Sequence, residues 1–511
     1  MKVSELLDRI VEGLDNEAIY DGRRRVTYRD LQVESDKLAV ALLEKGVQKG
    51  DKVGVCLPNW HETVILFFAV SKIGAIIVPF NPRYRKHEVQ HIVKDSGVKI
   101  LFISPSFIEL NSIDDIASDV NDIVTVRFHF EGLLSYSELL KTNREGRPPN
   151  VVIDPAEDVY AILYTSGTTG LPKGAMLTHD NITLSCESCA VRSESSPEDV
   201  YLISVPIFHI FGLVVCLMAA LYSKSRIVLQ EKYSPSEALE LVEKERITIR
   251  HGVPAMFNLE LNVLEKIKFD ISTLRIGMSG GAPCPAETTK AVTTKMNMIK
   301  SNGYGITELG SLTATYGTED DKKLYESVGV PLPGIEIKIV NENRELLSAN
   351  EIGEIACKGF GKRKGYLNAP EKTMETIDSE GWFYTGDQGY LDEDGYLYFV
   401  GRKKEMIIRG GYNIYPMELE EVLYKHPKVL EAAVIGLPDP LMGECVCAAI
   451  KIKPNMQANS EEIMNFMKEN LASFKVPSQV IFLEEFPVTA SGKIQKVKLQ
   501  ETLAQLANSN K

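Results

Sequence analysis

The first half of the chain alternates between helical and strand-like patterns of apolar residues. Residues 28–43 and 61–70 repeat their apolar positions with the helical period, whereas the short apolar runs 52–57 and 75–79 are typical of buried strands. Further strand-like runs occur at residues 99–102, 159–163, 226–229 and 274–277. This order of elements predicts parallel sheets with helices packed on their faces.

A different pattern begins after Gly329. Residues 336–340 and 353–358 alternate apolar and polar side chains with a period of two, which predicts half-buried antiparallel strands. A turn at residues 392–395 follows between two further strands. The remaining segments predict a compact unit, with helices at residues 416–424 and 461–471 and strands at residues 430–435 and 480–483. We place a domain boundary near Gly401, before this unit.

One apolar segment, residues 205–222, is uncharged at neutral pH and nearly long enough to cross a bilayer. It contains Pro206, His209 and Gly212, however, and it has no partner span in the chain. We therefore predict a buried helix that is entered through a polar loop, and no integral membrane segment.

Composition narrows the class of protein. The 511 residues include 44% hydrophobic and 25% charged residues, as expected for a globular protein of two or more domains. The formal net charge is −13 and no basic stripe stands out, which disfavours a nucleic-acid partner. The eight cysteines are scattered, apart from the pairs Cys186/Cys189 and Cys445/Cys447. Because no second C-x-x-C pair is present, we expect reduced thiols of a cytoplasmic protein and not a zinc site.

The stretch from Tyr164 to Gly174, YTSGTTGLPKG, follows the predicted strand 159–163 and is rich in Ser, Thr and Gly. Glycines let backbone N–H groups approach a ligand closely, and hydroxyl groups and Lys173 add donors, so the loop suits a polyphosphate. It is not a Walker A loop, because it lacks the terminal Gly-Lys-Ser/Thr. Composition alone would also fit a Ser/Gly-rich surface loop.

Five further motifs follow in order, and each is weak evidence on its own because a turn, a surface ion pair or a solvated lysine would explain it. They are Gly280–Pro283 (GGAP), Asn302–Glu308 (NGYGITE), Tyr384–Asp387 (YTGD), Gly401-Arg402, and Pro487–Ile494 (PVTASGKI). Together with the Tyr164–Gly174 loop, they resemble the signatures of the adenylate-forming enzymes: acyl-CoA synthetases, luciferases and peptide-synthetase adenylation domains. The resemblance covers essentially the whole chain and is greatest to bacterial fatty acyl-CoA ligases.

This resemblance implies an α/β fold. It has a large N-terminal domain of stacked αβ sheets with a small β-barrel-like subdomain at residues 1–401. A small mobile α+β domain follows at residues 402–511, with a hinge at Lys404. One orientation of the small domain would deliver Lys493 for adenylation, and the other would present Gly410 and Gly411 to a thiol. Gly411 would line the pantetheine tunnel, where a Cβ would obstruct passage.

The implied reaction joins a carboxylate to AMP, although the carboxylate and the α-phosphate are both anions. The site must therefore hold fixed positive charge between them and bind the departing pyrophosphate. Catalysis is assigned by the resemblance to Lys493 and His209, and Mg²⁺ binding to Glu308. The expected contacts to ATP and CoA come from Thr165, Ser166, Gly167, Thr168, Thr169, Gly170, Lys173, Gly281, Ala282, Asn302, Gly303, Tyr304, Gly305, Thr307, Asp387, Arg402, Lys404, Gly410 and Gly411. Of these, Tyr304 offers a face to adenine and Asp387 accepts from both ribose hydroxyls, whereas Asn302 stands where the family usually has Gln or Glu.

The acid substrate is narrowed by the segment that begins at Phe208. Amino-acid-activating relatives place an Asp near His209 to pair with the substrate ammonium, so His209 argues against an amino acid. The apolar residues 213–220 and Ile306 favour an apolar acyl group. We expect a medium- or long-chain fatty acid, with an aryl or coumarate-type acid as the alternative.

For the acceptor we expect CoA, because no carrier domain follows Lys493 in this sequence. Transfer from an acyl-AMP ligase to a carrier protein is the alternative. A non-catalytic nucleotide sensor on the same fold is disfavoured, because Lys493 and Glu308 are both present. The cofactors would thus be ATP, Mg²⁺ and CoA, the partners a small carboxylic acid and CoA, and the assembly could be a homodimer.

Overall fold

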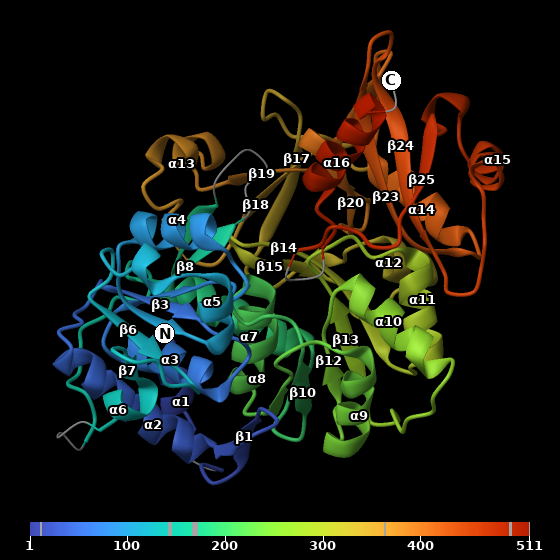
Figure 1. Cartoon of the computed structure of the whole chain (residues 1–511). Coiled ribbons are helices and arrows are strands. Elements are labelled where there is room, and N and C mark those ends of the chain that lie inside the picture. Colours follow the sequence, from blue (N-terminus) through green and yellow to red (C-terminus); the bar gives the residue numbers. More distant parts are fainter. Residues whose placement is uncertain (11–12, 142–145, 166–171, 362–363, 490–492, 510–511) are drawn as a thin grey trace.

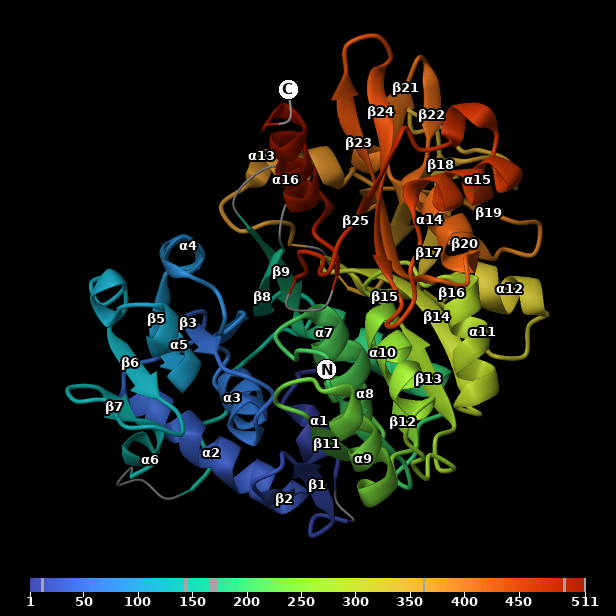
Figure 2. The ribbon, with the colours of Figure 1, turned by 45° about the vertical axis from the view of Figure 1, so that its right-hand side comes forward.

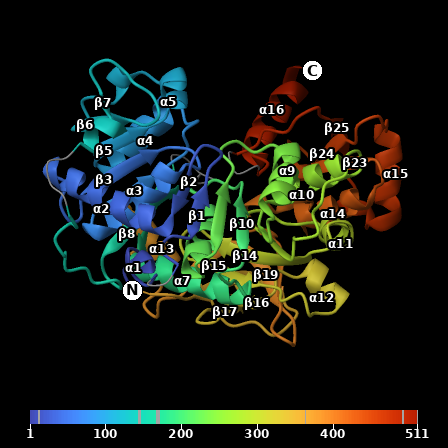
Figure 3. The ribbon, with the colours of Figure 1, turned by 90° about the horizontal axis from the view of Figure 1, so that it is seen from below.

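The computed structural model describes residues 1–10, 13–141, 146–165, 172–361, 364–489 and 493–509 (Figure 1). It has a large N-terminal domain of two mainly parallel sheets and a smaller C-terminal domain. Seen from below, the seven-stranded sheet, the nine-stranded sheet and the C-terminal domain follow one another from left to right (Figure 3). The mixed α/β class expected from the sequence is confirmed.

The seven-stranded sheet has the strand order β7-β6-β5-β3-β4-β8-β9. Its strands are β3 (Lys52–Cys56), β4 (Ile76–Pro79), β5 (Val98–Ile103), β6 (Asp122–Thr125), β7 (Leu134–Ser135), β8 (Val159–Thr165) and β9 (Lys173–Thr178). Neighbouring strands are parallel except β8 and β9, which form an antiparallel pair. Its helices include α2 (Tyr28–Glu44), α3 (His61–Lys72), α4 (Lys86–Ser96), α5 (Pro105–Leu110) and α6 (Tyr136–Leu139). The sheet thus ends in the pair that flanks the Tyr164–Gly174 loop.

The nine-stranded sheet has the order β16-β15-β14-β13-β12-β10-β11-β1-β2. Its strands are β1 (Glu17–Tyr20), β2 (Arg25–Thr27), β10 (Val200–Ile203), β11 (Arg226–Leu229), β12 (Ile249–Arg250), β13 (Ile276–Ser279), β14 (Ile299–Ile306), β15 (Gly310–Ala314) and β16 (Val330–Pro331). The centre is parallel, and the edge strands β2, β15 and β16 are antiparallel to their neighbours. The associated helices are α1 (Glu5–Asp8), α9 (Pro235–Glu245), α10 (Pro254–Leu264), α11 (Ala286–Lys295) and α12 (Asp321–Glu326).

Helix α7 (His179–Arg192) joins the two sheets, because it contacts β8 and β9 on one side and β15 on the other. It begins at a capping box in which Thr178 and Asn181 satisfy each other's backbone N–H groups. The residues buried around it belong to one continuous apolar cluster that spans both sheets. Relative movement of the two sheets would open this core, so they form a single rigid base for the site.

The segment predicted as a buried helix is a π-helix, Phe211–Met218, followed by α8 (Ala219–Tyr222). All residues from Gly212 to Leu221 are buried, so this prediction is confirmed. Among the described residues, no helix has the length and apolar character that crossing a membrane requires.

The barrel-like subdomain expected from the sequence is a four-stranded antiparallel sheet with β17 and β20 at its edges. Its strands are β17 (Glu336–Val340), β18 (Gly353–Lys358), β19 (Phe383–Leu391) and β20 (Leu397–Arg402), with α13 (Pro370–Thr376) between β18 and β19. A short 3₁₀ turn, η3 (Lys403–Glu405), leads from β20 into the final sheet.

The final sheet contains β21 (Ile407–Arg409), β22 (Tyr412–Ile414), β23 (Val429–Asp439), β24 (Gly443–Ile452) and β25 (Gln479–Phe482), with helices α14 (Pro416–Lys425), α15 (Ser460–Asn470) and α16 (Lys496–Ser509). It has its own apolar core, centred on Leu419, Val434 and Val446. Helix α14 faces α11 of the large domain (Figure 2).

Candidate active site

Asp387 and Arg402 lie directly opposite each other, on the antiparallel strands β19 and β20. Asp387 is 6% exposed, its Oδ2 accepts from the Tyr304 hydroxyl at 2.7 Å, and Arg402 Nε lies 3.4 Å from its Oδ1. Burial raises the pKa of Asp387, while Arg402 and the Tyr304 hydroxyl oppose that rise. A carboxylate in this position can accept from neighbouring hydroxyl groups, as the sequence predicted for ribose.

Lys493 belongs to a chain segment far from Asp387 in the sequence, yet it lies within electrostatic range of Asp387 and Arg402. Its backbone is fixed by two hydrogen bonds with Thr489: Lys493 N donates to Thr489 Oγ1 at 3.1 Å, and Thr489 N donates to Lys493 O at 2.7 Å. Burial and the Arg402 charge lower the pKa of Lys493 to about 8, against the opposite effects of Glu405 and Asp387. We call Asp387, Arg402 and Lys493 the Lys493 cluster.

A second lysine supports this cluster and was missed by sequence reasoning. Lys496, the first residue of α16, lies 2.7 Å from Glu420 of α14 and 3.4 Å from Glu405 of η3. Burial opposes ionisation of Glu405, but Lys496, Arg402 and Lys493 together lower its pKa. The ion pairs therefore tie the segment after Lys493 to the segment after Arg402. No sequence signal identified Lys496, because its partners lie on other elements.

Glu308, predicted to bind Mg²⁺, follows β14, and its Oε1 accepts from the Tyr366 hydroxyl at 2.5 Å. Burial raises the pKa of Glu308. A single carboxylate fits Mg²⁺, which usually binds one or two carboxylates together with substrate phosphates. Sequence reasoning also missed Tyr366, which lies 58 positions from Glu308. Thr307, the neighbouring predicted contact, is partly exposed.

Tyr304 links the expected adenine side to the Lys493 cluster, because its ring lies 5.8 Å from the Phe399 ring while its hydroxyl reaches Asp387. The glycines on both sides are required by packing: a Cβ on Gly303 would lie 3.0 Å from the Met278 sulfur, and one on Gly305 would collide with the Gly310 carbonyl. After β13, Gly280 lies against the Phe211 ring, Gly281 has a φ of +78°, and Ala282 is partly exposed.

Asn302 differs from the expectation. It is 4% exposed, its Oδ1 accepts from Lys300 Nζ at 3.0 Å and Thr289 Oγ1 at 3.3 Å, and its Nδ2 donates to the Leu324 carbonyl at 3.2 Å. The protein engages this amide at both ends, which argues against the nucleotide contact predicted for the side chain. These bonds hold the middle of β14 in place, immediately before Gly303.

The Ser/Thr/Gly-rich loop connects β8 to β9, and its flanking residues Thr165 and Lys173 are directly opposite in the antiparallel pair. The predicted contacts Ser166, Gly167, Thr168, Thr169 and Gly170 lie outside the described residues. Because a strand and not a helix follows the loop, the exclusion of a Walker A motif is confirmed.

His209 follows β10 and precedes the π-helix, and its ring lies 4.8 Å from that of Phe208. Burial lowers the pKa of His209 to about 4, so the imidazole is neutral at pH 7. Gly212 in the same turn cannot be replaced, because a Cβ there would collide with the Pro206 carbonyl. The neutral ring thus sits at the entrance of the apolar π-helix, next to the Gly280 loop that Phe211 contacts.

Three residues that were predicted to contact ATP or CoA lie apart from the Lys493 cluster. Gly410 and Gly411 form the exposed turn between β21 and β22, with φ values of +57° and +86°. Lys404 lies in η3 and is exposed. The structure therefore brings Lys493 toward Asp387 and leaves the Gly410-Gly411 turn facing solvent.

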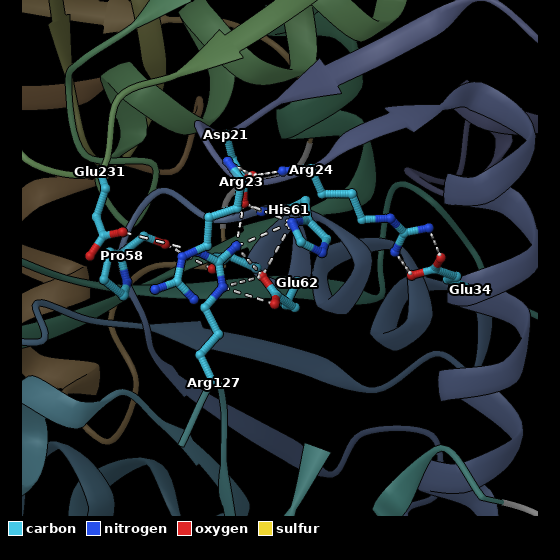
Figure 4. A network of polar contacts seen from close by, with 10 residues as sticks. Asp21, Arg23, Arg24, Glu34, Pro58, His61, Glu62, Arg127 and Glu231 are labelled. Carbon is cyan, nitrogen blue, oxygen red and sulfur yellow. Dashed lines mark hydrogen bonds and ion pairs between the residues drawn. The ribbon is translucent and has the colours of Figure 1, made fainter. Parts of the chain in front are cut away.

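A second buried charged group, the Arg127 network, lies elsewhere in the large domain and was not predicted (Figure 4). His61 Nδ1 lies 2.7 Å from Asp21 Oδ2, Arg127 contacts Asp21, and Arg127 Nη2 donates to Glu62 at 2.7 Å. His61 and the two carboxylates have the geometry of metal ligands. Arg127 already supplies the positive charge that they need, and its guanidinium stacks 4.2 Å over Trp60. The network joins the loop after β1 to the start of α3, and so the two large sheets.

Two family models match this chain: the AMP-binding enzyme model over residues 9–367 and the AMP-binding enzyme C-terminal domain model over residues 418–493. A long-chain-fatty-acid–CoA ligase of Bacillus subtilis (strain 168) is 34% identical, over 98% of this chain and 94% of that protein. The mitochondrial medium-chain acyl-CoA ligase ACSF2 of Homo sapiens is 34% identical, over 95% of this chain and 84% of that protein. The crystal structure of ATP-bound MatB from Rhodopseudomonas palustris superimposes with a TM-score of 0.88 and 30% identity, covering 99% of this chain and 100% of that one.

These matches agree with the order of motifs along the sequence and with the two-domain architecture. Enzymes of this kind use ATP and CoA. The chain belongs to the AMP-binding enzyme family, the adenylate-forming enzymes, and within it to the acyl-CoA synthetases.

Proposed function

We propose that this enzyme activates a medium- or long-chain fatty acid with ATP, releases pyrophosphate, and transfers the acyl group from acyl-AMP to CoA. The observation that carries the proposal is the Lys493 cluster, in which two cations and a carboxylate from three separate segments lie together. The names of the two relatives, which specify medium- and long-chain acyl groups, support the choice of acid.

Lys493 and Arg402 supply the positive charge that the first half-reaction requires. The attacking carboxylate and the α-phosphate repel each other, so fixed cations between them lower the barrier. With a pKa of about 8, Lys493 is mainly protonated at pH 7. We propose that its ammonium contacts the developing charge, while Arg402 binds a ribose or phosphate oxygen.

Asp387 and Tyr304 would orient the nucleotide. Asp387 Oδ2 accepts from the Tyr304 hydroxyl, and Oδ1, which lies 3.4 Å from Arg402 Nε, would also accept from the ribose hydroxyls. Glu308 would hold Mg²⁺, which neutralises phosphate charge when bound. The Tyr366 hydrogen bond fixes the Glu308 carboxylate in one orientation.

The acyl group would lie beyond His209. The π-helix that follows is buried and apolar, and a neutral imidazole at its start can donate one hydrogen bond to a carboxylate without pairing with an ammonium. These properties support an apolar acid. They do not distinguish a fatty chain from an aryl group, which a substrate panel will decide.

Transfer to CoA would follow a rotation of residues 402–511 about Lys404. The exposed Gly410-Gly411 turn would then replace Lys493 at the site. Positive φ values at both glycines give the turn a shape that other residues rarely adopt. The rotation, the domain boundary between residues 401 and 402, and the role of Gly410 and Gly411 in the transfer step are all parts of this proposal.

The decisive experiment is pyrophosphate release from ATP with a panel of aliphatic and aryl acids, with and without CoA. We expect release with fatty acids and acyl-CoA formation when CoA is added. A preference for aryl acids would show that the substrate is an aryl acid and not a fatty acid. Accumulation of acyl-AMP in the presence of CoA would favour a carrier protein as the acceptor. If no acid is adenylated, the alternative of a non-catalytic nucleotide sensor on the same fold would be favoured.

A cytoplasmic location and a homodimer are also proposed. Cell fractionation and light scattering of the purified protein test them. The human relative is named as mitochondrial, so a signal in the mitochondrial fraction is the specific result that would contradict the first of these.

A further inference from the structure

One buried cation outside the proposed catalytic residues has a sulfur atom as its neighbour. Lys300 of β14 is 0% exposed, and its Nζ donates to Cys284 Sγ at 3.4 Å and to Asn302 Oδ1 at 3.0 Å. The Phe257 ring lies 5.2 Å from the ammonium. In the part of the chain that the structure describes, no carboxylate lies within ion-pair distance of Lys300. A buried ammonium with no anionic partner is costly.

Cys284 is the neighbour of this ammonium that carries a reactive group. An ammonium that donates to a sulfur stabilises the thiolate over the thiol, and the thiolate is the reactive form. Burial lowers the pKa of Lys300, and the interaction with Cys284 opposes that effect. The Cys284 sulfur also lies 3.4 Å from Thr289 Oγ1, a hydroxyl that can donate to a thiolate.

Accessibility separates Cys284 from the other cysteines. All eight lie within the described ranges; seven are buried, and Cys284 alone is partly exposed. Burial raises the pKa of several of the others, including Cys56 and Cys216, which makes them unreactive. A reagent in solution should therefore meet one accessible thiol, and the Lys300 ammonium lies beside it.

The location of Cys284 connects this thiol to the adenylation site. It directly follows the Gly280–Pro283 loop, which we assign to the adenine side. Helix α11 begins two residues later and contacts α14 of the C-terminal domain. Tyr424 of α14 lies within electrostatic range of Cys284. A chemical change at this sulfur would therefore alter the Gly280–Pro283 loop and the packing of α11 against α14.

We propose that Cys284 and Lys300 form a peroxide-sensitive thiol site whose oxidation slows the adenylation half-reaction. The Cys284 thiolate attacks one oxygen of a hydroperoxide, so that an S–O bond forms and the O–O bond breaks. The leaving hydroxide or alkoxide takes a proton from Lys300 or solvent. Sulfur loses two electrons to the peroxide, and the product is a sulfenic acid. A small thiol reduces it through a mixed disulfide.

The consequence for catalysis rests on the proposed function, whereas the chemistry of the thiol does not. An added oxygen on Cys284 must fit between the Gly280–Pro283 loop and Lys300, which also donates to Asn302, the residue before Gly303 in β14. Displacement of the loop or of this part of β14 would disturb nucleotide binding.

The first experiment measures thiol reactivity without catalysis. The native full-length protein is treated with iodoacetamide, and the labelled peptides are identified by mass spectrometry. We expect Cys284 to be the fastest-reacting cysteine, and Lys300→Met to slow its labelling at least about tenfold. Faster labelling of another cysteine, or an unchanged rate in a Lys300→Met protein with a cooperative thermal transition, would overturn the proposal.

The second experiment does not depend on the folding of the Lys300 variant. Wild-type protein and Cys284→Ser are exposed to hydrogen peroxide with dimedone, a sulfenic-acid trap, and a parallel sample is assayed for acyl-AMP formation. Wild type should form the dimedone adduct at Cys284 and, without the trap, lose activity that dithiothreitol restores, whereas Cys284→Ser should keep its activity. Equal loss in both proteins would refute the site.

The two experiments also separate this inference from the proposed function. If no acid is adenylated but Cys284 is labelled and trapped as expected, the function is wrong and the thiol site stands. If acids are adenylated but peroxide does not affect the enzyme, the function stands and the thiol site is wrong.

Discussion

The Arg127 network and the Lys493 cluster are both buried groups of mixed charge, but they use their charges differently. In the Arg127 network, one guanidinium contacts two carboxylates and a histidine joins them, so every charged group has a close partner of opposite sign. In the Lys493 cluster, Arg402 and Asp387 are 3.4 Å apart and Lys493 has no carboxylate within ion-pair distance among the described residues. The first arrangement is complete without a ligand. The second retains positive charge that an anionic substrate can neutralise.

With the function proposed above, this difference separates a group that stabilises the fold from one that is held ready for catalysis. Burying charge is expensive, so a protein that keeps a cation unpaired must hold it by other means. Here the neighbouring pairs of Lys496 with Glu405 and Glu420, and the Thr489 hydrogen bonds, fix the backbone around Lys493. Variants of the two groups should therefore affect different measurements.

The largest expected effect is on folding, from Arg127→Ala. Removing the guanidinium leaves the carboxylates of Asp21 and Glu62 buried without their main cation, which should lower the free energy of unfolding by about 3–5 kcal/mol. Urea denaturation measures this loss. Arg29→Ala, which removes an exposed ion pair with Asp15, is the control and should change the stability far less, because solvent screens this pair. Similar small losses in both variants would show that the Arg127 network stabilises the fold no more than a surface ion pair does.

Lys493→Ala should impair catalysis and leave stability nearly unchanged. The activation free energy of acyl-AMP formation should rise by about 3–4 kcal/mol. The rate of thioester formation from supplied acyl-AMP and the denaturation midpoint should change little. Lys498→Ala, an exposed lysine on α16, is the matched control. Equal losses in both half-reactions would show that Lys493 is not specific to adenylation.

Gly411→Leu should spare adenylation and slow the transfer to CoA by at least tenfold, about 1.4 kcal/mol, because the side chain would obstruct the thiol. Gly411 has a φ of +86°, so the substitution also strains the turn. Gly395→Leu is the appropriate control, because Gly395 has a φ of +82° and equally open surroundings. If both variants slow transfer alike, strain and not obstruction is the cause.

The smallest expected effect is the pH dependence of adenylation. Lys493 acts in its protonated form, and its pKa of about 8 means that the rate should fall as pH rises: about 90% of the maximum at pH 7, half at pH 8 and about 10% at pH 9. Single-turnover acyl-AMP formation across this range measures it. Transfer to CoA should instead rise with pH, since the thiolate is the nucleophile. A flat adenylation profile to pH 9 would contradict the assignment.

Local patterns predicted much of the secondary structure. The strands β11, β17 and β18 have the predicted bounds, because their apolar residues alternate or cluster between clear turn residues. Strand β13 begins at Ile276, two residues later than predicted, since Leu274 packs in a neighbouring apolar cluster and mimics a strand residue. The π-helix geometry of residues 211–218 was not predictable, because an uninterrupted apolar run has no periodicity that distinguishes a π-helix from a buried α-helix.

The sequence by itself determined the order of motifs and placed the Ser/Thr/Gly-rich loop after a strand. Through the family resemblance it also named Lys493 as the candidate catalytic lysine and Asp387 and Arg402 as candidate nucleotide contacts. Only the tertiary structure decided that Asp387, Arg402 and Lys493 lie together. It also decided that Tyr366 holds Glu308, that Lys496 supports the cluster, that Asn302 is engaged within the protein, and that Lys300 faces Cys284. The physical reason is that periodicity reports which side of its own element a residue faces, whereas charge pairing depends on which other element that side meets. The Arg127 network, whose members span residues 21 to 127, left no local pattern at all.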